Sequence, residues 1–302
     1  MRLGAAVLVV FGVSSLVFLL LHLVPGDPVE VMLGESAGTA DREALREALG
    51  LNLPLWQQWL DYLGQLVRLD LGTSLHSKRP ITELLAERIP VTAMLALASL
   101  VLSLLIAVPL GVLAAMFHNR AVDRGAMLFA LAGIAIPNFW LGPMLILVFA
   151  YWLGWLPVSG MQGPASLILP ALTLGTALAA LQSRMIRTAL LEELGRDYVR
   201  AAWARGLGHL RILMRHALRN ALLPVTTVLG LQLGALLTGA VVTEQIFNWP
   251  GVGQLLIESI QKRDYPVVQA CILFISVTYV SVNLLTDLTY ALLDPRVRLE
   301  AE

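Results

Sequence analysis

The chain has 302 residues, of which 57% are apolar and 14% are charged, and its formal net charge at pH 7 is zero. Soluble globular domains carry about 45–50% apolar and about 25% charged residues, so this composition excludes an ordinary water-soluble domain and predicts a polytopic membrane protein. The single cysteine, Cys271, lies in an apolar run, which excludes a disulfide framework and predicts a buried structural thiol.

Apolar stretches long enough to cross a bilayer occur six times, and each is expected to be helical because lipid offers no partner to an open strand. They are Leu3–Val24, Thr92–Phe117, Ala126–Trp152, Ala165–Ser183, Leu223–Val242 and Val267–Leu285. The first is followed by Pro-Gly-Asp-Pro and not by a small-residue cleavage site, so it is predicted to be a retained span. Prolines inside the spans are expected to be tolerated, because neighbouring helices re-satisfy the freed carbonyls. They are Pro109, Pro137, Pro143 and Pro170.

The spans predict four parts. These are a first transmembrane helix (1–24), an extracytoplasmic helical segment (25–91), a core of five spans with a cytoplasmic loop at 192–224 (92–293), and a cytoplasmic tail (294–302). Lysine and arginine gather in cytoplasmic loops, and they predict the orientation. With the N-terminus inside, the cytoplasmic pieces hold 13 Lys and Arg, whereas the external loops Leu153–Pro164 and Phe247–Pro266 hold two. Both termini are therefore predicted to be cytoplasmic.

The extracytoplasmic segment contains two predicted helices. Ala40–Leu49 has helical spacing and ends at Gly50, and Leu55–Leu69 is amphipathic. The second helix is expected to lie at the membrane interface, where aromatic residues are enriched. Its predicted apolar face consists of Trp56, Trp59, Leu60, Leu63 and Leu66. The segment serves either as a cap on the bundle or as a partner surface.

The stretch from Glu192 to Pro224 is a polar island between apolar runs, and it holds six arginines. A helix is predicted from Asp197 and is expected to end at Gly206 and Gly208, and a second helix is predicted over about His209–Ala221 and closed by Pro224. In the second helix the charged face is Arg211, Arg215 and Arg219, and a separate apolar stripe is Leu210, Met214 and Leu218. A row of like charges is destabilising on its own, so an anionic partner is expected. Lipid headgroups would suffice for the charge, but two helices joined by a double-glycine turn favour a protein.

The same stretch resembles the cytoplasmic loop of the transmembrane subunits of binding-protein-dependent ABC importers. Their motif is Glu-Ala-Ala, three residues and Gly, followed later by Leu-Pro; here it reads Arg200-Ala-Ala, three residues, Gly206, and later Leu223-Pro224. Arg200 in place of Glu and the long interval to Pro224 are similar to the peptide and nickel branch. Further segments resemble that branch, and within it the external segment after the first span resembles the first of the two permease subunits. They are Leu23–Pro28, Leu49–Trp59, Asp70–Ser74, Ile136–Gly142, Ile246–Gly253, Arg263–Gln269 and Leu293–Arg298.

This resemblance implies the all-helical type I ABC importer permease fold. It also implies a second homologous permease, two ATPase subunits and an extracytoplasmic substrate-binding protein as partners, besides membrane lipid, and no nucleic acid. The expected cargo is a di- or oligopeptide, with a nickel chelate or glutathione as the alternative.

The resemblance also implies two functional surfaces. The helix Asp197–Arg205 would dock on an ATPase, with Trp203 as an aromatic anchor, small alanines allowing close approach and Gly206 turning the chain. The residues predicted for this coupling are Tyr198, Arg200, Ala201, Ala202, Trp203, Gly206, Gly208 and Pro224. A loop with Trp249, Pro250, Gly251 and Gly253 would face the binding protein, or it is an ordinary turn.

Other classes of protein find less support. The chain has no GxxxxGK[ST], HExxH or GxSxG motif, and its five histidines are scattered, so no enzymatic activity, cofactor or metal site is expected. An ion-coupled secondary carrier stays open as the alternative of another class, although repeated halves and a mid-membrane acidic residue are not evident. Glu244 and Asp287 are expected to have interfacial or helix-pairing roles, with substrate contact as the alternative. Five polar residues either line a path or make packing hydrogen bonds: Asn138, Gln182, Thr227, Gln232 and Asn283.

Overall fold

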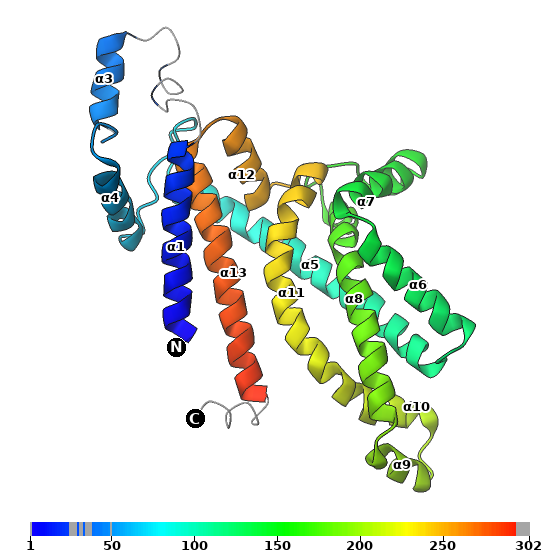
Figure 1. Ribbon diagram of the computed structural model, residues 1–302. Helices are drawn as coiled ribbons and strands as arrows, with labels where there is room; N and C mark the ends of the chain where they lie inside the picture. The colour runs from blue at the N-terminus through cyan, green and yellow to red at the C-terminus, as the bar shows by residue number, and fades with distance from the viewer. Residues whose placement is uncertain (1, 24–28, 30–32, 34–37, 49, 294–302) are drawn as a thin grey trace. The chain divides into compact units, whose positions relative to one another are not determined.

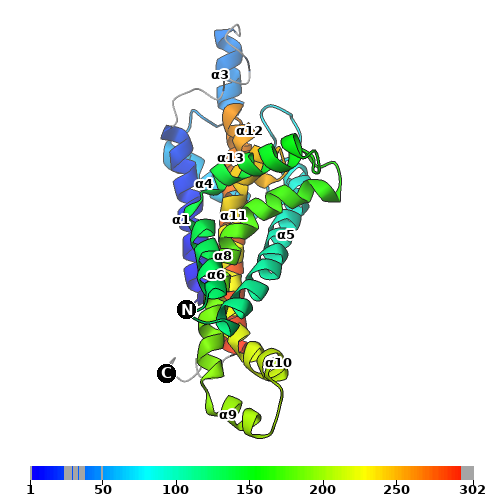
Figure 2. The same ribbon diagram turned by 90° about the vertical axis from the view of Figure 1, so that its right-hand side faces the viewer.

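The structure is a computed structural model that describes residues 2–23, 29, 33, 38–48 and 50–293. These residues form helices and loops, with an isolated β-bridge between Thr73 and Pro80. The chain divides into two compact units, Met1–Thr92 with Pro250–Leu284, and Ala93–Trp249 with Leu285–Glu302. Figure 1 shows the order of the helices, and Figure 2 shows them from the side.

The first unit contains α1 (Arg2–Leu23), α3 (Thr39–Ala48), α4 (Leu55–Val67), the first turns of α5 (Ile81–Met116), α12 (Val252–Gln261) and most of α13 (Tyr265–Leu293). Residues from α5, α12 and α13 form its apolar core, which includes Ile81, Leu85, Val252 and Val267. Cys271 is fully buried in the same core, as predicted for a structural thiol.

Helix α4 packs against α1 through aromatic side chains. Trp59 lies edge-on to Phe11, with ring centroids 5.8 Å apart, and its indole N–H donates to the Ser15 hydroxyl at 3.1 Å. Tyr62 stacks on Phe18, and burial raises the pKa of Tyr62 to about 12. Trp56 and Leu60, predicted on the same face as Trp59, are exposed. Part of the predicted apolar face therefore packs on α1, through Trp59, and another part is left exposed by the chain itself.

The second unit contains the rest of α5, then α6 (Ala121–Ala135), α7 (Asn138–Leu145), a π-helix η1 (Ile146–Trp152), a 3₁₀ turn η2 (Pro164–Leu167), α8 (Ile168–Leu194), α9 (Asp197–Ala204), α10 (His209–Ile212), a π-turn η3 (Leu213–Ala217) and α11 (Leu218–Phe247). Helix α8 is the centre of this unit and packs against α6, α7 and α11. Small residues let α5 approach α8 closely: a Cβ on Gly175 would lie 2.9 Å from the Ser99 carbonyl oxygen.

The described parts of the predicted spans fall almost entirely on helices, with one correction. Three helical stretches are long and apolar enough to cross a membrane, namely Ile81–Met116, Pro164–Leu194 and Tyr265–Thr286. The predicted span Ala126–Trp152 is not one helix: α6 and the stretch Asn138–Trp152 are bent by 105° at Ile136 and Pro137. Proline disfavours helical geometry at the residue before it and lacks an N–H of its own, and Ile136 and Pro137 are both extended. Pro137 therefore ends the helix, whereas the sequence predicted that it would be tolerated.

Candidate functional site

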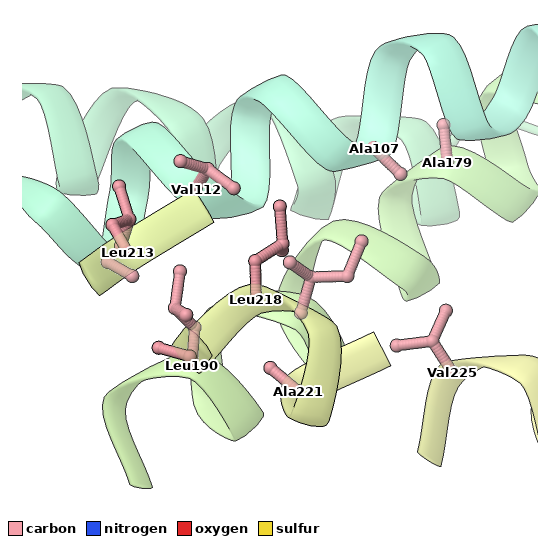
Figure 3. Close-up of a cluster of buried hydrophobic side chains, with 11 residues drawn as sticks. Ala107, Val112, Ala179, Leu190, Leu213, Leu218, Ala221 and Val225 are labelled. Carbon is pink, nitrogen blue, oxygen red and sulfur yellow. The ribbon is translucent and has the colours of Figure 1, made fainter. Parts of the chain in front are cut away.

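The polar island lies at one end of α8 and α11, and in both views α9 and α10 project beyond these helices. Its base is an apolar cluster in which Leu213, Leu218 and Leu190 converge from η3, α11 and α8 (Figure 3). Ala221 and Val225 continue the packed face along α11, and Val112 adds the contact from α5. This cluster anchors the loop to three helices of its own unit.

Helix α9 ends as predicted, and the reason is the backbone of Gly206. This glycine has φ of +78°, the left-handed conformation that side chains rarely adopt. The Gly206 N–H donates to the Trp203 carbonyl at 2.9 Å, and the Leu207 N–H donates to the Ala202 carbonyl at 3.3 Å. These two bonds form a Schellman motif, which satisfies the last carbonyls of the helix.

Gly208 plays a different part from Gly206. It precedes α10 with φ of −64° and ψ of 146°, which any residue adopts. A Cβ added there would meet nothing within 4 Å. The fold of the chain therefore gives no reason for a glycine at position 208.

Pro224 does not close the second helix of the loop, contrary to the prediction. The helical path from His209 runs through α10 and η3 into α11, and Pro224 lies inside α11. Its side chain is exposed and borders a surface hollow of about 430 Å³ that Arg184 and Glu192 also line. Helices of membrane proteins tolerate such prolines, because nearby groups re-satisfy the freed carbonyl.

The π-turn η3 changes which side chains of the loop are buried. A π-turn winds more residues into one turn than an α-helix does, so the packed face shifts around the axis. Leu213, Ala217 and Leu218 are buried, whereas Leu210 and Met214 are 65% and 52% exposed. The predicted stripe of Leu210, Met214 and Leu218 is therefore split. The three arginines of the predicted charged face are all exposed: Arg211, Arg215 and Arg219.

A hydrogen-bond network centred on Glu193 connects α9 to both neighbouring long helices. The Tyr198 hydroxyl on α9 donates to the Glu193 carboxylate on α8 at 2.5 Å, and the Asn220 amide on α11 donates to the Tyr198 oxygen at 3.2 Å. Arg196 makes an ion pair with Glu193 at 2.8 Å. Partial burial, followed by the bond to Glu193, raises the pKa of Tyr198 above its ordinary value. The sequence pattern did not single out Glu193 or Asn220.

The predicted coupling residues divide into an exposed and an internal set. Trp203 is 50% exposed and its ring meets His209 edge-on, with centroids 5.2 Å apart. Ala201 and Arg200 are also exposed, and Arg200 makes an exposed ion pair with Asp197. Ala202 is buried with Val199 and Ile212 in a small cluster inside the loop, so its small size serves internal packing.

The second predicted surface, Trp249 to Gly253, is mostly buried. Trp249 has no exposed surface, and Gly251 and Gly253 are also buried, whereas Pro250 is half-buried. Asn248 adopts the left-handed conformation that ends α11, and the Trp249 N–H donates to the Glu244 carbonyl at 2.8 Å. The Val252 N–H donates to the Thr92 hydroxyl at 2.9 Å. In this structure Trp249 thus presents no side chain for a partner.

Polar groups inside the second unit make packing contacts. Asp123 on α6 is buried and pairs with Arg187 on α8, with Nε 2.6 Å from Oδ1. This pair fixes Arg187 to α6. The buried Gln182 donates to Gln232 at 2.6 Å and accepts from Ser103, which favours a packing role for both glutamines. Asn138 of this unit and Asn283 of the first unit are half-buried, and the side chains of Thr227 and Asp287 lie outside the described part.

Glu244, at the end of α11, is fully buried. Among the described residues, no group of three or more His, Cys, Asp or Glu is placed to hold a metal ion.

Two family models match the chain. The binding-protein-dependent transport system inner membrane component matches residues 107–299, and the N-terminal part of the corresponding membrane component matches residues 1–96. The glutathione transport system permease proteins GsiC of Escherichia coli K12 and Shigella dysenteriae are each 42% identical over 297 residues, which is 98% of this chain and 97% of theirs.

A solved structure shares the fold. It is the inward-facing MetNI methionine ABC transporter, at a TM-score of 0.60 and 18% identity, covering 70% of this chain and 96% of that one. The likeness supports the type I ABC importer permease fold. The family models, the near full-length relatives and the Arg200–Gly206 motif agree. The chain belongs to the binding-protein-dependent transport system inner membrane components, as an ABC importer permease of the peptide and nickel branch.

Proposed function

We propose that the chain is the first of two permease subunits of an ATP-driven importer of short peptides, and that residues 192–224 couple it to separate ATPase subunits. The supporting observation is that the loop exposes the apolar side chains of Trp203, Leu210 and Met214, while α9 and α10 project beyond the long helices (Figure 1). Exposed apolar side chains that form a contiguous patch are a mark of protein interfaces. Exposed arginines flank them, which suits a partner surface that carries negative charge.

The connections of α9 give the coupling a physical route. Because Glu193 on α8 and Asn220 on α11 both bind Tyr198, a displacement of α9 acts on both long helices together. Reversing a two-state gate from about 1:99 to 99:1 requires about 5.5 kcal/mol of differential binding. Closure of the nucleotide-bound ATPases would supply it, because this chain has no phosphate-binding loop of its own.

The remaining partners and the location follow from the same proposal. A second homologous permease completes the pore, a substrate-binding protein delivers cargo from outside, and both termini lie in the cytoplasm beneath the inner membrane. The Lys and Arg distribution supports this orientation.

The cargo proposed first is a di- or oligopeptide. Glutathione is the second candidate, since the 42% identical relatives are named glutathione permeases and glutathione is itself a tripeptide. A nickel chelate is the third. Uptake of a labelled dipeptide, glutathione and nickel by cells that carry or lack the chain separates the three.

Capture of the ATPase by the solubilised chain tests the coupling. The wild type is expected to co-purify with the ATPase subunit of its transporter, and Trp203→Ala is expected to lose most of this capture. Trp155→Ala is the matched control, because Trp155 is also exposed (69%) but lies outside the loop. Equal capture by wild type and Trp203→Ala would contradict the docking role. Uptake that persists without cellular ATP at a constant proton gradient would instead support a secondary carrier.

A further inference from the structure

Three of the first unit's lysine and arginine side chains without a described ion-pair partner lie in two segments that a buried carboxylate joins. Lys78 lies in the turn between Ser74 and Arg79, and Lys262 and Arg263 follow α12. All three are exposed. Arg79, next to Lys78, differs from them, because it pairs with Glu87 at 2.6 Å and with Glu83 at 3.6 Å. We call Lys78, Lys262 and Arg263 the cationic tip.

A buried carboxylate holds the two segments of the cationic tip together. Asp264 is 3% exposed and accepts three hydrogen bonds from the turn: from the Ser74 hydroxyl at 2.5 Å and from the backbone N–H groups of Leu75 and His76 at 3.1 and 3.2 Å. The turn is closed by a bond from the Ser74 N–H to the Arg79 carbonyl at 2.9 Å. The turn that carries Lys78 and the residue that follows Arg263 are thus fixed to each other.

Two of the three cations occupy backbone positions where glycine is the ordinary choice. Lys78 has φ of +58° and Arg263 has φ of +54°. Arg263 is the left-handed residue that ends α12, where the Asp264 N–H donates to the Ser259 carbonyl at 2.8 Å. Residues with a Cβ are strained in this conformation, and such strain persists at sites where the side chain serves a function. At both strained positions the residue present is positively charged.

We infer that the cationic tip is a docking surface for an acidic face of the extracytoplasmic substrate-binding protein. This inference rests on the proposed function, since it requires an external partner. Unpaired cations on a surface raise the association rate of a partner with negative charge and fix its orientation. Lipid headgroups attract cations without any fixed geometry, whereas the Asp264 bonds fix the backbone that carries these charges. The fixed geometry favours a protein face.

Replacement by glycine removes the charges without destabilising the fold, so the effect of charge can be measured by itself. In Lys78→Gly/Arg263→Gly both charges are lost while the backbone strain is relieved, so the variant is expected to unfold at the same temperature as the wild type or higher. Leu69→Gly is the matched control, because Leu69 is exposed and left-handed (φ +58°) but uncharged.

The experiment measures association of the importer's purified substrate-binding protein with the assembled transporter in nanodiscs of neutral lipid. The double variant is expected to associate about tenfold more slowly at low ionic strength, and the difference is expected to shrink at high salt, while Leu69→Gly behaves as wild type. An unchanged association rate overturns the inference. So does a loss that appears only when anionic lipid is added, because headgroups would then be the occupant.

ATPase capture in the same preparations reports on the proposed function separately: if the wild type captures ATPase but shows no salt-sensitive association, only the present inference fails.

Discussion

Trp203 and Trp249 both lie at helix ends of the same type, but one side chain is exposed and the other is buried. Each lies at the C-terminus of a helix that ends in a Schellman motif, around Gly206 in one case and Asn248 in the other. Trp203 is 50% exposed, whereas Trp249 is fully buried. Both were predicted from the sequence to contact a partner. The difference shows that an aromatic residue in a turn motif identifies the turn but does not tell whether its ring serves docking or packing.

Replacing the two tryptophans is expected to have the largest effect and to separate their roles. Trp249→Ala removes a fully buried ring, so the free energy of unfolding is expected to fall by about 3–5 kcal/mol. Trp203→Ala removes a half-exposed ring and is expected to stay within about 0.5 kcal/mol of the wild type. Denaturation in mixed micelles measures both values. Similar losses for the two variants would contradict the comparison.

The two residues that end the helices are expected to differ by a smaller amount. Gly206→Ala places a Cβ in the left-handed region and is expected to cost about 1–2 kcal/mol. Asn248→Gly removes a Cβ from that region and is expected to be neutral or slightly stabilising. Hydrogen exchange of the Leu207 and Trp249 amides reports each motif locally. Faster exchange at Leu207 in Gly206→Ala is expected; unchanged exchange there would show that the glycine is not required.

The sequence predicted the start of α9 at Asp197 and its end before Gly206, because a charged first turn and a left-handed glycine are local signals. It also predicted that the spans are helical, since backbone satisfaction in lipid requires it. Proline was less predictable. Pro137 ends a helix and Pro224 does not. Both follow an apolar residue, so the packing of neighbouring helices decides the outcome.

The buried faces of the loop depend on two features that have no signal in the sequence. The π-turn at Leu213–Ala217 shifts the packed face, so Leu218 is buried while Met214 is exposed. The network of Glu193, Tyr198 and Asn220 joins residues up to 27 positions apart. Spacing rules for a regular helix cannot anticipate either feature, because both arise from tertiary contacts.

A substitution in the Glu193 network is expected to affect coupling to the ATPase more than the stability of the fold. Tyr198→Phe keeps the ring and removes the hydroxyl that joins α8 to α11 through α9. The expected loss of stability is about 1 kcal/mol, the net value of one or two hydrogen bonds. ATPase capture is expected to persist while transport per ATP hydrolysed falls, because the displacement of α9 would reach the long helices less directly. Transport at the wild-type ratio would show that the network only stabilises the loop.

The smallest expected effect on stability is that of replacing Gly208. This replacement tests whether the glycine is needed for contact with an ATPase or for the fold itself. Serine is favoured at the position before a helix, so Gly208→Ser is expected to leave the free energy of unfolding unchanged or to raise it by a few tenths of a kcal/mol. The added side chain meets nothing within 4 Å in the chain itself. If an ATPase approaches the backbone closely at this point, capture of the ATPase falls although the fold is intact. Undiminished capture would remove Gly208 from the docking surface and leave the exposed side chains of Trp203, Leu210 and Met214 as its contacts.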